Sequence, residues 1–145
     1  MEFQLGTVEG LVAVQSSFNG AFSGTRVLVT GHTGFKGSWL SSWLIALGAE
    51  VTGYALAPDT TPSLYSDMEL GRSVDSRIGD IRDAEKVAAL VAEVRPEIVL
   101  HLAAQPLVRR SYAEPRYTFE TNVLGTLNLL EAVRGSGDCR AVVNV

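Results

Sequence analysis

The sequence predicts an α/β protein in which helices cover both faces of a doubly wound parallel sheet. Two observations lead to this prediction. Short, apolar, β-branched runs alternate with longer segments whose apolar residues recur every three or four positions. A glycine-rich heptapeptide lies directly between the first apolar run and the first helical segment. Such alternation is typical of βαβ units, in which the strands are parallel and the helices pack on the sheet.

The first strand is expected at residues 26–30, where the run RVLVT is apolar and bounded by polar residues. A helix is predicted over residues 38–48, because five apolar residues recur there at helical spacing: Trp39, Leu40, Trp43, Leu44 and Leu47. Gly48 stands where a glycine commonly ends a helix.

A second strand at residues 50–56 and a weak third strand at residues 74–79 flank a loop of mixed polarity. Within that loop we expect one helical turn at residues 64–70. Asp83 is expected to cap a helix that runs to about Val94 and ends before a proline.

The last elements are a fourth strand at residues 98–102, a long helix at residues 115–134 ended by Gly135, and a fifth strand at residues 141–145. The long helix has a wide apolar face, formed by Val123, Leu124, Leu127, Leu130 and Val133. A buried strand is an unusual place for a domain to finish. We therefore expect a domain over residues 25–145 that is incomplete at its C-terminus, preceded by a loosely attached leader at residues 1–24.

The composition favours a soluble domain with a core of its own. The chain has 145 residues, of which 46% are hydrophobic and 19% are charged, and its formal net charge is −4. This acidic balance argues against a nucleic acid partner, which requires clustered Lys and Arg. No apolar run approaches the roughly 18 residues of a membrane span, and no basic cluster marks a secretory signal. We expect a cytoplasmic protein without a membrane partner.

Metal and disulfide chemistry is not expected. The single cysteine, Cys139, excludes an internal disulfide and a cysteine-rich zinc site. The two histidines, His32 and His101, lie far apart and lack carboxylate companions at ligand spacing.

The strongest functional signal is the heptapeptide GHTGFKG at residues 31–37. Glycine permits a tight turn at Gly31, close approach of a pyrophosphate at Gly34, and close packing of helix on strand at Gly37. The helix that follows offers free N–H groups and a partial positive charge to phosphates. The heptapeptide therefore predicts a Rossmann-type dinucleotide-binding domain, the alternative being a purely structural glycine-rich turn.

Three further segments accompany the heptapeptide: GDIRD at residues 79–83, HLAAQ at residues 101–105 and TNVLGT at residues 121–126. Together, and in this order, the four segments resemble the extended short-chain dehydrogenase/reductase family of nucleotide-sugar enzymes. The resemblance covers about residues 22–145. Within the family, the stretches GHTGFKGSWL, PSLY and HLAAQPLVRRSY are most similar to 4,6-dehydratases.

The resemblance implies NAD as cofactor and a nucleotide sugar, CDP-glucose, as the substrate of the complete enzyme. The product would be a 4-keto-6-deoxy sugar nucleotide for O-antigen synthesis, and the enzyme would be a homodimer. The heptapeptide and the resemblance together assign cofactor contacts to Gly31, Thr33, Gly34, Phe35, Lys36, Gly37, Asp80, Ile81, Leu102, Ala103, Ala104, Gln105 and Thr121.

Several of these assignments have alternatives. Asp80 would accept a hydrogen bond from the adenine amino group, with Ile81 packed on the ring; a helix cap is the other possibility, which Asp83 fits better. Asn122 lies in an apolar helix and has either a functional or a structural partner. His32 and Lys36 would contact cofactor phosphate, or lie in a solvated loop.

Arg109 and Arg110 would bind the diphosphate of the substrate, because guanidinium groups suit bidentate phosphate contacts. The alternative is a solvated pair of surface residues.

In NAD-binding domains an acidic residue usually follows the second strand and selects NAD. The second strand of this sequence ends without one, and Asp59 comes later. NAD is therefore implied by the resemblance and not by this position.

No catalytic residue is expected in this chain. The Tyr-x-x-x-Lys pair of the family and its Thr-Asp segment are absent from the sequence. We expect both beyond Val145, and we expect the present chain to be inactive by itself. The alternatives are another enzyme of the family, such as a nucleotide-sugar epimerase, or a non-catalytic dinucleotide-binding module.

Overall fold

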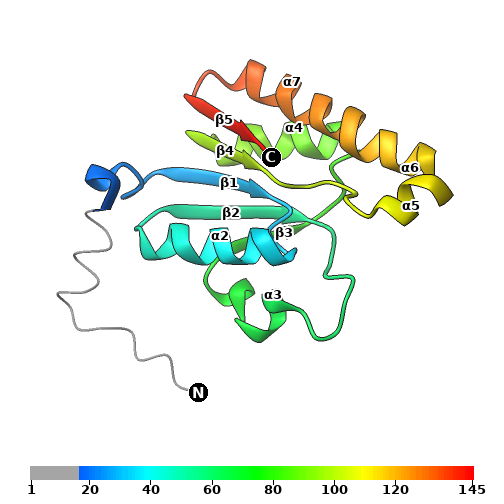
Figure 1. Ribbon diagram of the computed structural model, residues 1–145. Helices are drawn as coiled ribbons and strands as arrows, with labels where there is room; N and C mark the ends of the chain where they lie inside the picture. Colours follow the sequence, from blue (N-terminus) through cyan, green and yellow to red (C-terminus); the bar gives the residue numbers. More distant parts are fainter. Residues whose placement is uncertain (1–16) are drawn as a thin grey trace.

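The computed structural model describes residues 17–145, and its sheet has five parallel strands in the order β3-β2-β1-β4-β5 (Figure 1). The chain builds outward from β1 to β3, then returns to the other side of β1 to add β4 and β5. This is the doubly wound parallel sheet that the sequence predicts. The strands are β1 (Arg26–Thr30), β2 (Glu50–Ala55), β3 (Asp75–Ile78), β4 (Ile98–His101) and β5 (Ala141–Asn144).

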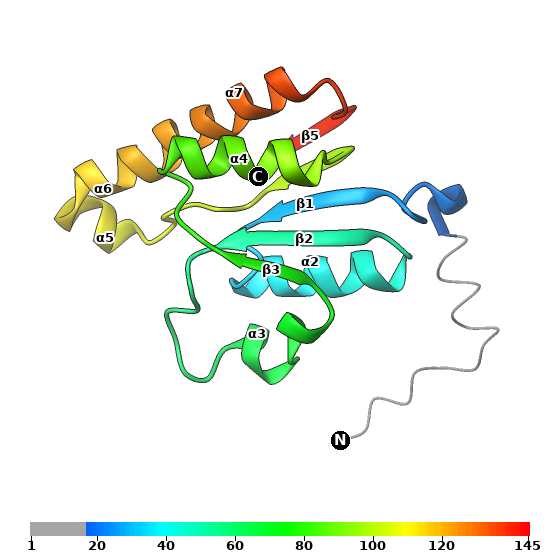
Figure 2. The ribbon, with the colours of Figure 1, turned by 180° about the vertical axis from the view of Figure 1, so that it is seen from behind.

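Helices cover both faces of the sheet (Figures 1 and 2). The short helix α3 (Leu64–Asp67) and α2 (Phe35–Ala46) lie on one face, and α4 (Ala84–Val94) and α7 (Thr126–Ser136) pack together on the other. Alternate residues of β1 pack into two hydrophobic cores, one on each face of the sheet. Val27 and Val29 pack with Leu44 of α2, whereas Leu28 packs with α4 and α7.

Helix α2 begins at Phe35, three residues earlier than predicted, and its buried side is made of small residues and one leucine: Gly37, Ser38, Ser41 and Leu44. Trp39 and Trp43 are 51% and 55% exposed. The helix lies so close to the turn before it that a Cβ on Gly37 would come within 2.0 Å of the Gly31 carbonyl oxygen. The predicted C-terminal stop is confirmed, since Gly48 follows the helix with a φ of +85°.

Helix α4 follows its prediction closely. The Asp83 side chain accepts a hydrogen bond from the Lys86 backbone N–H and so caps the first turn. The helix ends at Val94, and Arg95 takes a left-handed conformation immediately before Pro96. Its buried residues are Val87, Leu90 and Val91.

The long C-terminal helical region differs from its prediction in three respects. A separate helix, α5 (Val108–Ala113), precedes it, although no apolar period marks that segment. The region itself comprises α6 (Pro115–Phe119), a π-helical segment (Glu120–Gly125) and α7. The stop is Gly137, with a φ of +68°, because Gly135 retains a helical conformation.

The expected leader at residues 1–24 lies mostly outside the described residues. From Ser17 to Gly20 the chain forms a 3₁₀ turn, and Phe22 packs against the core on the α2 side of the sheet. None of the helices within residues 17–145 has both the length and the apolar character needed to cross a bilayer.

Candidate dinucleotide-binding site

A cavity of about 870 Å³ opens at the carboxyl ends of β1, β2 and β4. In doubly wound sheets this edge, where the strand order reverses, is where ligands bind, and the volume suits a small-molecule site. The lining includes every residue that the sequence assigned to the cofactor: Gly31, Thr33, Gly34, Phe35, Lys36, Gly37, Asp80, Ile81, Leu102, Ala103, Ala104, Gln105 and Thr121.

The three glycines of the heptapeptide serve different purposes. Gly31 has a φ of +77°, and a Cβ there would lie 2.8 Å from the Ala103 backbone nitrogen. Gly37 has no room for a Cβ either. At Gly34 the nearest atom to a Cβ would be the Gly31 carbonyl oxygen at 3.4 Å, with a φ of −76°. The protein itself would therefore accept a side chain at Gly34, which would instead fill part of the cavity.

The N-terminus of α2 faces the same cavity. Gly34 is the N-cap residue and supplies no side chain to cap the helix, and the residues of the first turn line the cavity. Their N–H groups and the helix dipole favour an anion here. The Thr33 hydroxyl donates to the Leu56 carbonyl oxygen at 2.8 Å and so ties the turn to the end of β2.

His32 does not belong to this site, so its assignment as a phosphate contact or a solvated loop residue is wrong. Its side chain is fully buried, and its Nε2 lies 2.7 Å from Ser76 Oγ. Burial lowers the pKa of His32 to about 4. A neutral core imidazole has no charge to offer a phosphate, and Lys36, which does line the cavity, remains the candidate.

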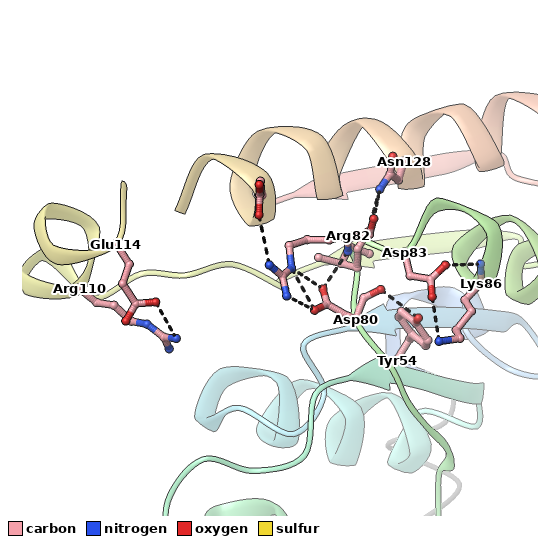
Figure 3. A network of polar contacts seen from close by, with 10 residues as sticks. Tyr54, Asp80, Arg82, Asp83, Lys86, Arg110, Glu114 and Asn128 are labelled. Carbon is pink, nitrogen blue, oxygen red and sulfur yellow. Dashed lines mark hydrogen bonds and ion pairs between the residues drawn. The ribbon is translucent and has the colours of Figure 1, made fainter. Parts of the chain in front are cut away.

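The Asp80 carboxylate also lines the cavity, and Figure 3 shows it beside Arg82. Its Oδ1 accepts the Arg82 backbone N–H at 2.9 Å, and Nη2 of Arg82 lies 2.6 Å from Oδ2. Hydrogen bonding from Arg82 lowers the pKa of Asp80 below its usual value. Since Asp83 caps α4, Asp80 is not the helix cap. The Tyr54 hydroxyl donates to the Asp80 carbonyl oxygen at 3.1 Å and fixes the backbone.

Asn122 holds the loop that follows β4. Its Oδ1 accepts the Gln105 backbone N–H at 2.7 Å, and its Nδ2 donates to the Gln105 carbonyl oxygen at 3.1 Å. The geometry therefore supports a structural partner for Asn122. The Gln105 amide is also used internally, donating to Thr118 Oγ1 at 3.0 Å and accepting the Leu107 N–H at 2.8 Å.

Behind this loop, a chain of hydrogen bonds fixes the protonation of His101. Thr30 Oγ1 accepts the backbone N–H groups of Leu102 and Ala103, so its own proton goes to His101 Nδ1 at 2.6 Å. Nε2 of the imidazole then donates to Thr126 Oγ1 at 2.9 Å. His101 is neutral in this arrangement, and burial lowers its pKa accordingly.

Thr121 is buried in the π-helical segment and lines the cavity, yet its hydroxyl has no hydrogen-bond partner among the described residues. Buried hydroxyl groups normally have one, and π-helical turns often occur at functional sites. The unused hydroxyl of Thr121 and the room for a side chain at Gly34 together fit a polar ligand that passes the N-terminus of α2.

The two arginines predicted for the substrate are separated. Arg110 lines the cavity, where its Cζ lies 4.4 Å from the centre of the Tyr117 ring and its Nη2 lies 3.3 Å from Glu114 Oε2. Arg109 is exposed and is not part of the lining. Within residues 17–145, no group of three or more His, Cys, Asp or Glu residues is placed to hold a metal ion.

Sequence reasoning missed several lining residues, among them Tyr54, Gly79 and Tyr117. The pairing of Tyr54 with Gly79 had no local signal, because the two residues are far apart in sequence. A Cβ on Gly79 would lie 2.4 Å from the Tyr54 ring, so the glycine makes room for the aromatic side chain.

The doubly wound parallel sheet, with a glycine turn and a helix N-terminus at its switch point, defines a Rossmann-type α/β domain. The chain belongs to the GDP-mannose 4,6-dehydratase family, whose sequence model matches residues 28–143. This confirms the resemblance to nucleotide-sugar enzymes that the four segments indicate.

Among known proteins, the chain is 57% identical over 124 residues to CDP-glucose 4,6-dehydratase of Salmonella typhimurium, covering 86% of this chain and 34% of that protein. It is 35% identical over 115 residues to GDP-mannose 4,6-dehydratase of Vibrio cholerae, covering 75% of this chain and 31% of the relative. The chain thus spans about a third of the length of the curated relatives that it matches.

Solved structures of epimerases have the same fold. UDP-glucose 4-epimerase of Stenotrophomonas maltophila, with bound NAD, aligns at a TM-score of 0.69 and 32% identity over 81% of this chain and 35% of that one. The Thermus thermophilus UDP-glucose 4-epimerase in complex with NAD gives a TM-score of 0.67 and 41% identity, covering 78% of this chain and 35% of that one.

Proposed function

We propose that this chain forms the NAD-binding part of a CDP-glucose 4,6-dehydratase. The observation that carries the proposal is that one cavity, at the switch point of the sheet, gathers all thirteen residues that the sequence assigned to a dinucleotide. The identity of 57% with a CDP-glucose 4,6-dehydratase supports the substrate class.

In this proposal three groups of lining residues each bind a different part of NAD. The N–H groups between Gly34 and Gly37 hold the diphosphate, with Lys36 adding positive charge. Asp80 accepts a hydrogen bond from the adenine amino group, beside the apolar side chain of Ile81. The free hydroxyl of Thr121 bonds the ribose on the nicotinamide side. Bound NAD supplies a hydride acceptor and donor for the sugar.

Asp59 supports NAD over NADP. It lies beyond the end of β2 and lines the cavity, where a carboxylate would accept hydrogen bonds from ribose hydroxyls and repel a 2′-phosphate. Calorimetric titration of the chain with NAD and NADP tests the proposal. We expect NAD to bind more tightly, and we expect Asp59→Asn to narrow the difference. Equal affinity for the two, or none for either, would overturn the cofactor assignment.

For the complete enzyme we propose oxidation at C4 of CDP-glucose, loss of water across C5–C6 and reduction at C6. The reaction would take place in the cytoplasm and give a 4-keto-6-deoxy sugar nucleotide for the synthesis of surface polysaccharide. The residues that transfer protons would lie outside this sequence. Arg110 is the residue that we expect to bind the substrate diphosphate.

The likeness to UDP-glucose 4-epimerases favours nucleotide-sugar epimerisation as the second candidate function. A measurement of whether the full-length protein dehydrates CDP-glucose or epimerises UDP-glucose distinguishes them.

We also propose a homodimer formed through the C-terminal helical region. Its outer side carries exposed apolar side chains that a monomer would leave in water: Phe119, Val123, Leu124, Leu127 and Leu130. Contiguous exposed apolar residues of this kind are typical of an interface between proteins.

A further inference from the structure

Arg82 does not line the cavity, but its side chain contacts two residues that do, Asp80 and Tyr117. Its guanidinium and backbone N–H bond the Asp80 carboxylate, and its Nη1 lies 3.3 Å from Glu120 Oε2. Its Cζ lies 4.6 Å from the centre of the Tyr117 ring. Arg82 therefore joins the end of β3 to the helical region that carries Thr121.

The hydrogen bonds at Asp80 leave room for one more donor. A carboxylate has about four lone-pair positions. Arg82 supplies three N–H groups to them: the backbone N–H bonds Oδ1, Nη2 bonds Oδ2, and Nε is shared between the two oxygens at 3.1 and 3.0 Å. The Asp80 side chain is 29% exposed and lines the cavity, so the remaining position is available to a ligand there.

Arg82 is itself held firmly. Glu120 is fixed on its other side by Arg116, whose Nε lies 2.7 Å from Glu120 Oε1. Asn128 donates from Nδ2 to the carbonyl oxygens of Ile81 and Arg82, both at 3.1 Å (Figure 3). The guanidinium is thus anchored by two carboxylates, an aromatic ring and its own clamped backbone.

We propose that Arg82 is a positioning residue for base recognition: it fixes the Asp80 carboxylate so that one acceptor position faces the cavity and selects a purine with a 6-amino group. This inference rests on the proposed function, in which Asp80 meets adenine. Without the guanidinium, the carboxylate would keep only the backbone N–H of residue 82 and could turn toward solvent. The acceptor would then no longer favour an amino donor over a carbonyl oxygen at the same place.

The test compares NAD with nicotinamide hypoxanthine dinucleotide, in which a 6-oxo group replaces the 6-amino group, by calorimetric titration of the whole chain. We expect the parent to prefer NAD by about tenfold or more, since one hydrogen bond to a charged group differs between the ligands. In Arg82→Met the preference should fall to about twofold, and Arg82→Lys should restore part of it. The matched control is Arg77→Met, which breaks ion pairs with Asp75 and Glu93 outside the cavity.

The outcomes separate this inference from the proposed function. A parent that binds neither ligand would refute the proposed function, and with it the inference. A parent that binds NAD without preferring it, or an Arg82→Met variant with native circular dichroism that keeps the full preference or binds NAD more tightly, would overturn the role of Arg82 alone. If Arg82→Met does not fold, Arg82→Lys decides, because an unchanged preference in that variant would contradict a bidentate positioning role.

Discussion

The imidazole of His32 fills the space that a side chain on Gly53 would need. A Cβ at Gly53 would lie 2.3 Å from His32 Cγ, too close for any real contact. The ring also packs edge-on against Tyr65, with 5.5 Å between the ring centres, and bonds Ser76. Although it belongs to the glycine heptapeptide, His32 is thus a core residue that joins the turn after β1 to β2 and β3.

Gly53→Ala should destabilise the chain strongly for this reason. Adding a methyl group against a fully buried ring forces the ring or the strand to move, at a cost of about 1–3 kcal/mol in the free energy of unfolding. Urea unfolding measures the loss. The control is Gly135→Ala on α7, where nothing in the described part of the chain lies within 4 Å of the new Cβ; it should be neutral, or stabilising by up to about 1 kcal/mol. Equal effects at the two sites would contradict the packing of His32.

Stability should fall as the pH decreases from about 6.5 to 4. In the unfolded chain His32 binds a proton below pH 6.5, whereas in the folded chain its pKa is about 4. The unfolded state therefore binds more protons in this window, which lowers the free energy of unfolding by about 3 kcal/mol across it. His101 adds to the effect, since its pKa is also lowered by burial.

Urea unfolding at pH 7.0, 6.0 and 5.0 measures this loss, and His32→Gln should remove the larger part of the pH dependence. The carboxylates whose pKa is lowered by ion pairs, such as Asp80 and Asp138, lose their contribution only below about pH 4. A parent and variant with the same slope between pH 7 and 5 would show that His32 is not buried neutral.

Gly34→Val should abolish NAD binding and leave the fold intact. The protein leaves room for a side chain there, and the backbone is extended, so the added atoms project into the cavity beside the N-terminus of α2. Calorimetry should show no heat of binding for NAD, while the thermal midpoint stays within a few degrees of the parent. A variant that binds as well as the parent would mean that the heptapeptide is only a structural turn.

Much of the fold and of the candidate site could be predicted from local sequence patterns. Strands such as β1 are short apolar runs, and the cofactor candidates belong to contiguous segments, so both follow from neighbouring residues. Tertiary partners do not. Nothing near His32 in the sequence indicates that its ring contacts Gly53 and Ser76. Likewise, nothing near Asn122 indicates that it bonds the backbone of Gln105. Helix α5 was missed because its residues form no apolar stripe and none is buried.

The isolated chain should show no dehydratase activity on CDP-glucose. None of its four tyrosines is followed four positions later by lysine, and the nearest imitation is Tyr112 with Arg116. The structure gives that pair no shared role, because Tyr112 is 84% exposed and Arg116 is bonded to Glu120. General acid–base catalysis needs groups within hydrogen-bond reach of the substrate. Formation of 4-keto sugar above a heat-treated control would refute this expectation.

The chain should self-associate at high concentration, through one or both of two surfaces. The outer side of the helical region exposes Leu127 and its apolar neighbours, about half of each side chain lying in water. Among the strands of residues 17–145, β5 pairs only with β4, so its other edge offers N–H and C=O groups to a second strand. Helix pairing would saturate at a dimer, whereas pairing at a strand edge would continue to grow with concentration.

Two matched charge substitutions separate these surfaces. Leu127→Glu and Val143→Glu each place a carboxylate at a side chain that is 49% exposed, on the helical region and on β5 respectively. If the helices form the interface, sedimentation should show a dimer for the parent and Val143→Glu but a monomer for Leu127→Glu, because burying an unpaired carboxylate costs several kcal/mol. If the strand edge forms it, the parent and Leu127→Glu should sediment as species that grow with concentration, and Val143→Glu should sediment as a monomer. A parent chain that sediments as a monomer at high concentration would exclude both.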